Sequence, residues 1–296
     1  MRILITGGTG FIGSALLPAL SAAGHEIILL SRQQRPCKGR YRSVTDLDQL
    51  ADSEHVDAII NLAGASLAGR RWSEAYKEEL VASRIDTTRS LLRLIQRLQR
   101  KPAVLLSASA IGYYGHHDDE VLAEDGDTVP GFAQSLCEDW ESVAGEAEAF
   151  GVRVCTLRLG VVLDRDGGAL QQMLLPFRLG VGNYVGDGRQ WFSWIHREDV
   201  VAAIRFLLAD GALHGPFNLT APEPVTAKGF CAALQRHKRT LVTLPMPAGV
   251  MRLMLGEMAD ELLIAGQRVV PEALQQAGFS FRYPSVDQAL ADILGA

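Results

Sequence analysis

A glycine-rich turn directly follows the first apolar segment of the chain, and no other feature restricts the fold as much. Residues 2–6 read RILIT, residues 7–13 read GGTGFIG, and apolar residues with helical spacing then run from Phe11 to Ala23. Gly7 permits a tight turn, Gly10 lets the backbone approach a ligand, and Gly13 lets helix and strand pack closely. Free N–H groups at the start of the helix favour an anion such as a pyrophosphate. The context of strand and helix therefore predicts a nucleotide-binding turn rather than a purely structural one.

Strand-like and helix-like segments alternate over the first two thirds of the chain. Short apolar runs predict buried strands at residues 2–6, 27–30, 58–62, 104–107 and 152–159, with a weaker strand at 41–44. Helical spacing predicts helices at 11–23, 73–98 and 135–150. This order is typical of an α/β fold, a Rossmann-like doubly wound parallel sheet with right-handed crossovers.

The composition changes after residue 163. Glycines stand at 167, 168, 180, 182, 186 and 188, and the aromatic residues Trp191, Phe192 and Trp194 follow. Long glycine-rich insertions of this kind usually build the substrate side of such folds. We therefore expect a Rossmann-like domain over 1–163 and a cleft-closing loop with a smaller, mostly helical substrate portion over 164–296. Residues near 191–220, with a helix at 199–208 and a strand at 217–219, are expected to return to the first domain.

Charge and cysteine usage narrow the choice of partners. The 296 residues carry a net charge of −5 and no long run of basic residues, so we expect no nucleic-acid partner. No stretch reaches the roughly 18 apolar residues of a spanning helix, so we expect no membrane partner. The four cysteines are far apart and fit reduced thiols in a cytoplasmic protein. The expected partner is a small-molecule substrate, and a homodimer stays open.

The end of the second strand indicates which dinucleotide fits the turn. A site for NAD normally has an acidic residue there, which binds the ribose hydroxyls. No acid occurs between Ile27 and Thr45, whereas Ser31 and Arg32 follow the strand and Arg35 stands in reserve. Ser31 can donate a hydrogen bond and an arginine can pair with a 2′-phosphate. The sequence therefore predicts NADP(H). The residues assigned to the cofactor here are Gly7, Thr9, Gly10, Phe11, Ile12, Gly13, Ser31 and Arg32.

Several motifs together resemble a known family. The turn GGTGFIG is followed by NLAG at 61–64, after the fourth strand, and by SAS at 107–109, after the fifth. This spacing resembles the extended short-chain dehydrogenases/reductases. The segments RRWSEAYKEELVASRIDTTRSLL, LLPFRLGVGNYVGDGRQWFSWIHREDVV and LLIAGQRVVPEALQQAGFSFRYPSVDQAL resemble, more narrowly, their atypical "epimerase family" group of type 39U. The resemblance implies NADP(H) in a cleft between a Rossmann-like domain and a small C-terminal domain.

The resemblance also implies further site residues. The backbone of Leu62, Ala63 and Gly64 is expected to lie against the adenosine and ribose part of the cofactor, and Val161 to lie beside the nicotinamide. Arg84 shares an apolar helix stripe with its neighbours one turn away, so its charge needs an anionic partner. Glu79 or a cofactor phosphate can supply that charge, and a purely structural ion pair is an equal alternative. The aromatic residues at 191–194 either line the substrate pocket or belong to the core.

The chain departs from the family at its catalytic motif. The family uses a serine, a tyrosine and a lysine four residues after the tyrosine, whose charge lowers the pKa of the phenol. Ser109 fits the serine position, but Phe132 and Leu136 stand where the tyrosine and lysine belong. Either Tyr113 or Tyr114 supplies the phenol from another place, or the site binds NADP(H) without fast turnover.

Two functions follow from these features. The first is an oxidoreductase or epimerase-like enzyme that uses NADP(H) on a small carbonyl or sugar-like substrate. The second is an NADP(H)-sensing binding protein that regulates a partner. The only cations near the two tyrosines in the sequence are His116 and His117, which we expect in a solvated loop and not as metal ligands. The methionines between 246 and 258 are expected to serve core or interface packing.

Overall fold

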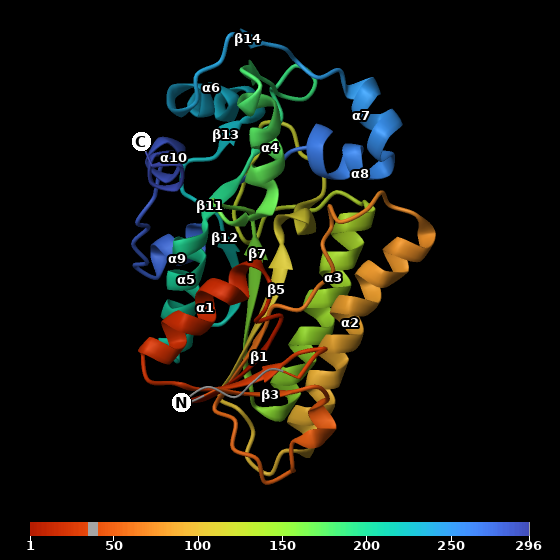
Figure 1. Ribbon diagram of the computed structural model, residues 1–296. Coiled ribbons are helices and arrows are strands. Elements are labelled where there is room, and N and C mark those ends of the chain that lie inside the picture. Colours follow the sequence, from red (N-terminus) through yellow and green to blue (C-terminus); the bar gives the residue numbers. More distant parts are fainter. Residues whose placement is uncertain (35–40, 296) are drawn as a thin grey trace.

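Seven parallel strands form the central sheet of the computed structural model, which describes residues 1–34 and 41–295 (Figure 1). Their order across the sheet is β12-β7-β5-β4-β1-β2-β3. The strands are β1 (Arg2–Thr6), β2 (Glu26–Leu30), β3 (Tyr41–Val44), β4 (Ala58–Asn61), β5 (Val104–Ala110), β7 (Arg153–Leu159) and β12 (Gly215–Leu219). The Rossmann-like α/β fold predicted from the sequence is confirmed.

The register aligns the carboxyl ends of the central strands at one edge of the sheet. Thr6 of β1 pairs with Leu30 of β2 and with Asn61 of β4, and Asn61 pairs with Ser107 of β5. Polar residues that follow these strands are therefore brought together, which is where open α/β sheets bind ligands. The strands themselves are apolar because helices cover both of their faces.

Two helical layers enclose the sheet (Figure 1). Helices α1 (Phe11–Ala22) and α5 (Arg197–Ala209) pack on one face, and α2 (Glu74–Arg97) and α3 (Phe132–Gly145) pack on the other. Residues of β1 are fully buried between the layers, with Ile3 and Ile5 in one core cluster and Leu4 in the other. Removing each such side chain from water stabilises the fold by about 1.5–3 kcal/mol, before the entropy cost of ordering it.

A smaller lobe lies beyond the carboxyl edge of the sheet (Figure 1). Its core includes Leu170, Phe230 and Leu290, all fully or almost fully buried. Its strands are β8 (Val161–Asp164), β9 (Val181–Gly182), β10 (Trp191–Phe192), β11 (Trp194–His196), β13 (Val225–Thr226) and β14 (Val242–Thr243), and β6 (Val121–Leu122) pairs with β15 (Arg268–Val269). Its helices are α4 (Gly168–Arg178), α6 (Ala227–His237), α7 (Ala248–Leu255), α8 (Glu257–Ala259) and α10 (Val286–Leu294), while α9 (Glu272–Gln276) packs beside β12.

Some element boundaries differ from those predicted. The third long helix begins at Phe132 rather than at residue 135, and its predicted end, Glu146–Phe150, is a 3-10 helix. A π-helical turn over Asp260–Ile264 was not predicted. The domain boundary predicted at residue 163 falls inside β8 and stays a prediction, although β12 does return to the sheet beside β7. Within 1–34 and 41–295, no helix is both long and apolar enough to cross a membrane.

Candidate functional site

The glycine-rich turn after β1 is tightly packed, as its sequence predicts. Gly7 has a φ of +66°, and a Cβ atom on it would lie 2.2 Å from the carbonyl oxygen of Leu62. A Cβ atom on Gly13 would lie 2.4 Å from the Cα atom of Gly8. On Gly10 the nearest atom would be the Gly7 carbonyl oxygen, at 3.1 Å. Gly7 and Gly13 are thus needed for packing, whereas Gly10 borders open space.

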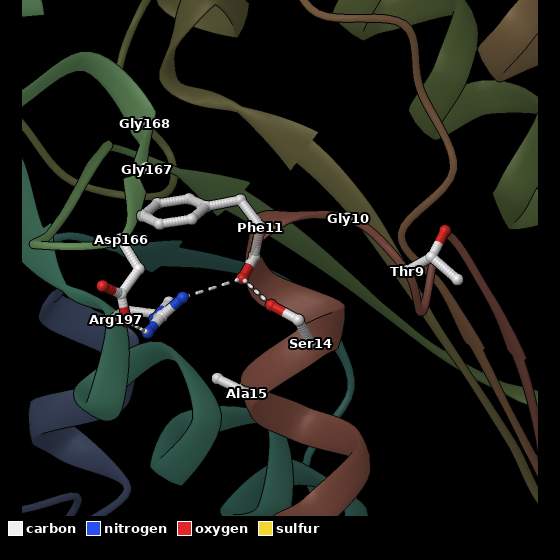
Figure 2. Close-up of a pocket in the computed structure, with 9 residues that line it drawn as sticks. All are labelled: Thr9, Gly10, Phe11, Ser14, Ala15, Asp166, Gly167, Gly168 and Arg197. Carbon is white, nitrogen blue, oxygen red and sulfur yellow. Dashed lines mark hydrogen bonds and ion pairs between the residues drawn. The ribbon is translucent and has the colours of Figure 1, made fainter. Parts of the chain in front are cut away.

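That open space is a pocket of about 510 Å³ (Figure 2). It is lined by Thr9, Gly10, Phe11, Ser14, Ala15, Asp166, Gly167, Gly168 and Arg197. Helix α1 begins at its rim with Gly10 as N-cap, and no side chain caps the first backbone N–H groups. These groups and the helix dipole favour an anion. The residues present therefore fit the pyrophosphate of a dinucleotide.

The small lobe closes one side of this pocket through Phe11 (Figure 2). A Cβ atom on Gly167 or Gly168 would lie 2.8 Å from the Phe11 ring, so only glycine allows this contact. The guanidinium of Arg197 lies 4.9 Å from the ring centroid and its Nη1 donates to the Phe11 carbonyl oxygen at 3.4 Å. Arg197 also pairs with Asp164 at 2.7 Å. Arg197 was not predicted as a site residue from the sequence.

The predicted residues for the adenosine end follow β2. Ser31 and Arg32 directly follow Leu30, which pairs with Thr6 at the end of β1. Arg32 is exposed and has no ion-pair partner among the described residues. Ser31 accepts a long 3.4 Å hydrogen bond from the Gln33 amide. The reserve residue Arg35 lies outside the described residues. Arg32 is thus free to pair with a phosphate.

A buried polar network fixes the turn after β4. The Asn61 side chain donates to Thr88 at 2.9 Å and to Ser107 at 3.2 Å, and accepts from the Thr6 hydroxyl at 2.6 Å. The Thr6 hydroxyl in turn accepts from the Ala63 amide at 3.2 Å. Because buried polar groups need partners, this network sets one conformation for the turn through Leu62, Ala63 and Gly64. Their predicted contact with the cofactor stays a prediction.

Arg84 of α2 lies against this turn and is only 8% exposed. Its Nη1 donates to the Leu80 carbonyl oxygen and its Nη2 to the Ala65 carbonyl oxygen, each at 3.0 Å. Glu79, one of the two partners considered from the sequence, pairs instead with Arg70 at 3.4 Å on the exposed side of the helix. Within the described residues no carboxylate neutralises Arg84. Burial lowers the pKa of its guanidinium for that reason.

Ser109 ends a chain of buried hydrogen bonds. Its hydroxyl donates to Oε1 of Glu141 at 2.6 Å, and it is 2% exposed. Both carboxylate oxygens of Glu141 accept from Arg158, each at 2.9 Å. Burial lowers the pKa of Arg158, but the bonds to Glu141 outweigh burial and leave that pKa raised. Ser109 is therefore turned toward Glu141, and Arg158 stays a cation.

The two tyrosines predicted as proton donors occupy different environments. Tyr114 is fully buried; its hydroxyl donates to Asn218 at 2.7 Å and accepts from Arg158 at 2.9 Å. Burial raises the pKa of its phenol to about 12. Tyr113 is half-buried, its hydroxyl binds no described residue, and Arg158 lies 3.5 Å from its ring centroid. The prediction that only histidines are near these tyrosines was wrong, and Tyr114 belongs to the core rather than to the cleft.

Phe132 and Leu136 lie where the family has its tyrosine and lysine. Phe132 packs edge-on against Trp72, with ring centroids 5.0 Å apart, and Leu136 is buried with Trp72 in the same cluster. Glu261, from the π-helical turn, accepts a hydrogen bond from the Ala133 amide at 3.2 Å and so caps α3. No phenol replaces the missing one at this position.

The remaining candidates lie in different parts of the structure. Val161 is half-buried and its amide donates to the Ser193 carbonyl oxygen at 2.9 Å. Trp194 is fully buried in the small-lobe core, so it does not line a substrate pocket. His117 is 9% exposed and lies 2.8 Å from Glu120, not in a solvated loop. His117 is buried because its ring packs back on its own turn, where Nε2 lies within hydrogen-bond distance (3.0 Å) of the Tyr114 carbonyl oxygen.

Comparison with known proteins adds to this geometry. A model of the NAD dependent epimerase/dehydratase family matches residues 3–219. The chain belongs to this family. It is an atypical extended short-chain dehydrogenase/reductase of the epimerase group, as the sequence motifs predicted. A model for a domain of unknown function matches residues 246–293 of this family member.

Relatives and solved structures match over the whole length. An epimerase family protein of Mycobacterium bovis is 40% identical over 97% of this chain and 96% of its own, and YfhF of Bacillus subtilis is 38% identical over 99% and 98%. The human epimerase family protein SDR39U1, solved with NADPH, is 34% identical with a TM-score of 0.90, over 100% of this chain and 99% of its own. A Corynebacterium glutamicum nucleoside-diphosphate sugar epimerase is 31% identical with a TM-score of 0.78, over 100% of this chain and 58% of its own.

Proposed function

We propose that this protein is an NADP(H)-dependent oxidoreductase or epimerase-like enzyme acting on a small carbonyl or sugar-like substrate. The observation that carries the proposal is the half-buried phenol of Tyr113, stacked on the Arg158 guanidinium at the carboxyl edge of the sheet. The glycine turn and the uncapped N-terminus of α1 provide the dinucleotide site next to that edge. The NADPH-bound human relative supports the same cofactor.

The choice of NADP(H) over NAD(H) depends on charge at the end of β2. An exposed Arg32 without an ion-pair partner, and the absence of an acid in that stretch, favour a 2′-phosphate. Gly7, Thr9, Gly10, Phe11, Ile12 and Gly13 would hold the pyrophosphate, and Leu62, Ala63, Gly64, Arg84 and Val161 would border the rest of the cofactor. Glu79 is left out of this set because it faces solvent and pairs with Arg70.

The cofactor, when bound, supplies or accepts a hydride at the nicotinamide. In the reductive direction, the hydroxyl of Tyr113 gives its proton to the substrate oxygen, and solvent returns one to the phenol. Arg158 packs against the face of the Tyr113 ring, 3.5 Å from its centroid, and so holds the ring in place. Ser109 acts as a positioning residue, because it holds Glu141 and Glu141 holds Arg158 beneath the Tyr113 ring.

The proposal is tested with NADPH that carries deuterium at nicotinamide C4. The purified protein is incubated with it and a panel of aldehydes, ketones and nucleotide sugars, and the products are analysed by mass spectrometry. Deuterium transferred to a substrate carbon is the expected result, and it should disappear in Tyr113→Phe. In parallel, the nucleotide sugars are incubated with NADP+ and checked for a change of stereochemistry. The absence of both deuterium transfer and a stereochemical change, with a protein that binds NADPH tightly, would contradict the enzyme proposal.

A second candidate is an NADP(H)-sensing protein that regulates a partner. It is favoured by one observation: Ser109, Tyr114 and Phe132 offer no free proton donor, since the first two are bound in the core and the third has none. In that case cofactor binding beside Phe11 would change the conformation of the small lobe through the contact of Gly167 and Gly168 with the Phe11 ring. Three results together would favour this candidate: tight NADPH binding, no deuterium transfer, and a change in the amide hydrogen exchange of the small lobe when the cofactor binds.

A further inference from the structure

Arg84 is a buried cation whose charge the described protein groups leave uncompensated. Its guanidinium donates to the carbonyl oxygens of Leu80 and Ala65 and, at 3.5 Å, to the Ser83 hydroxyl, and its Nε donates to no described residue. Such carbonyl bonds satisfy donors but do not neutralise a charge. Burying an unpaired cation is costly, and an anionic group of a ligand, such as the phosphate of the nicotinamide half, would offset that cost.

Arg84 lies near Leu136, the residue at the position of the missing lysine. Its guanidinium lies 5.2 Å from the Trp140 ring centroid, on the face of α3 that carries Leu136 one turn earlier. Leu136 packs in one cluster with Leu80, which lies one turn before Arg84 on α2. Arg84 thus brings a positive charge from α2 to the side of α3 where Leu136 carries none.

The sheet topology puts Arg84 on the nicotinamide side of the site. The dinucleotide of such folds crosses the edge at the turn after β1, and its 2′-phosphate end lies over β2, where Arg32 stands. Arg84 contacts the turn after β4, on the opposite side of β1 from β2. This strand order favours the nicotinamide half as the neighbour of the turn, rather than the adenosine part that the family resemblance implies. A Cβ atom on Gly64 would lie 3.2 Å from its Cζ, so the guanidinium lies directly against that turn.

We propose that Arg84 supplies, from α2, the cation that binds the nicotinamide half of NADP(H), in place of the lysine that Leu136 replaces. This proposal rests on the proposed cofactor and gives one of its residues a role. The rival explanation is structural: Arg84 would only hold the turn through the Ala65 carbonyl oxygen.

The two explanations differ in which ligands they affect. We would measure binding of NADPH and of 2′,5′-ADP, which lacks the nicotinamide half, by calorimetry for the wild type, Arg84→Gln and Arg84→Lys. Gln keeps a donor for the Ala65 carbonyl oxygen but no charge, and Lys keeps the charge. A charge-assisted hydrogen bond is worth about 1.5–3 kcal/mol, so NADPH affinity should fall roughly 10- to 100-fold in Arg84→Gln. Arg84→Lys should recover part of it, and 2′,5′-ADP should bind all three proteins alike.

Arg89→Gln is the matched control, since Arg89 is an exposed arginine of the same helix. It should leave both affinities unchanged. Equal losses of NADPH and 2′,5′-ADP in Arg84→Gln, or equal NADPH affinity in the Gln and Lys variants, would overturn the proposal in favour of the structural role. A wild type that binds neither ligand would instead refute the proposed cofactor, which keeps the two failures distinct.

Discussion

Replacing each of the two adjacent tyrosines by phenylalanine should separate stability from turnover. The Tyr114 hydroxyl is fully buried and joins two groups, Arg158 and Asn218. In Tyr114→Phe, Arg158 keeps its bond to the Glu124 carbonyl oxygen at 2.8 Å, but the Asn218 side-chain oxygen loses its donor. One buried acceptor without a partner costs about 1–3 kcal/mol. The free energy of unfolding should fall by that amount.

Tyr113→Phe is the matched control on the same turn. The Tyr113 hydroxyl binds no described residue, and its ring, which packs on Arg158, is kept. The free energy of unfolding should therefore change by less than about 0.5 kcal/mol, as for most surface changes. Turnover should fall by roughly 10²- to 10⁴-fold, the usual contribution of a positioned acid.

Urea denaturation followed by circular dichroism gives the stabilities, and deuterium transfer from labelled NADPH gives the turnover. The reasoning is refuted if Tyr113→Phe is the destabilised variant, or if Tyr114→Phe loses turnover while it keeps its stability. The first result would contradict the different environments of the two hydroxyls, and the second would make Tyr114 rather than Tyr113 the proton donor.

Three further predictions follow from single residues or segments. Calorimetry should show that Arg32→Ala weakens NADPH binding by roughly tenfold, because the variant loses one charge-assisted contact at an exposed site. The affinity for NADH should stay unchanged, and equal effects on both cofactors would argue against a 2′-phosphate contact. Burial lowers the pKa of His196 in the folded protein. The neutral His196 therefore contributes its full stability above the unfolded-state pKa of about 6.5, and this contribution is lost as the pH falls below that value. The free energy of unfolding should therefore fall at acidic pH in the wild type, and less so in His196→Asn. Asparagine is chosen because its side chain can still cap α5. The same dependence of stability on pH in both proteins would contradict this prediction. Segment 164–190 should exchange amide hydrogens faster than β1 without substrate, and comparable protection would count against a cleft-closing role.

The fold was largely predictable because its signals are local. The apolar run of β1, the glycines after it and the alternation of strands and helices each depend on neighbouring residues. The C-terminal π-turn was not predictable, since its Glu261 is fixed by the distant Ala133 amide. Element boundaries moved for a similar reason, because caps come from other parts of the chain.

The site was predictable where one motif builds it and not where distant residues meet. Arg158 was overlooked as a cation, although an arginine inside an apolar strand is itself a signal that a buried partner exists. Its partner Glu141 lies on α3, and no spacing rule connects the two. Tyr113 and Tyr114 are adjacent in sequence, and their environments differ because distant residues, Asn218 and Arg158, bind the Tyr114 hydroxyl.

The most direct test of the account is a titration of the wild-type protein with NADPH and NADH under identical salt conditions. Tryptophan fluorescence or calorimetry gives both dissociation constants. The account predicts that NADPH binds at least about tenfold more tightly, as one charge-assisted contact at the 2′-phosphate requires. Equal affinities, or tighter binding of NADH, would contradict it.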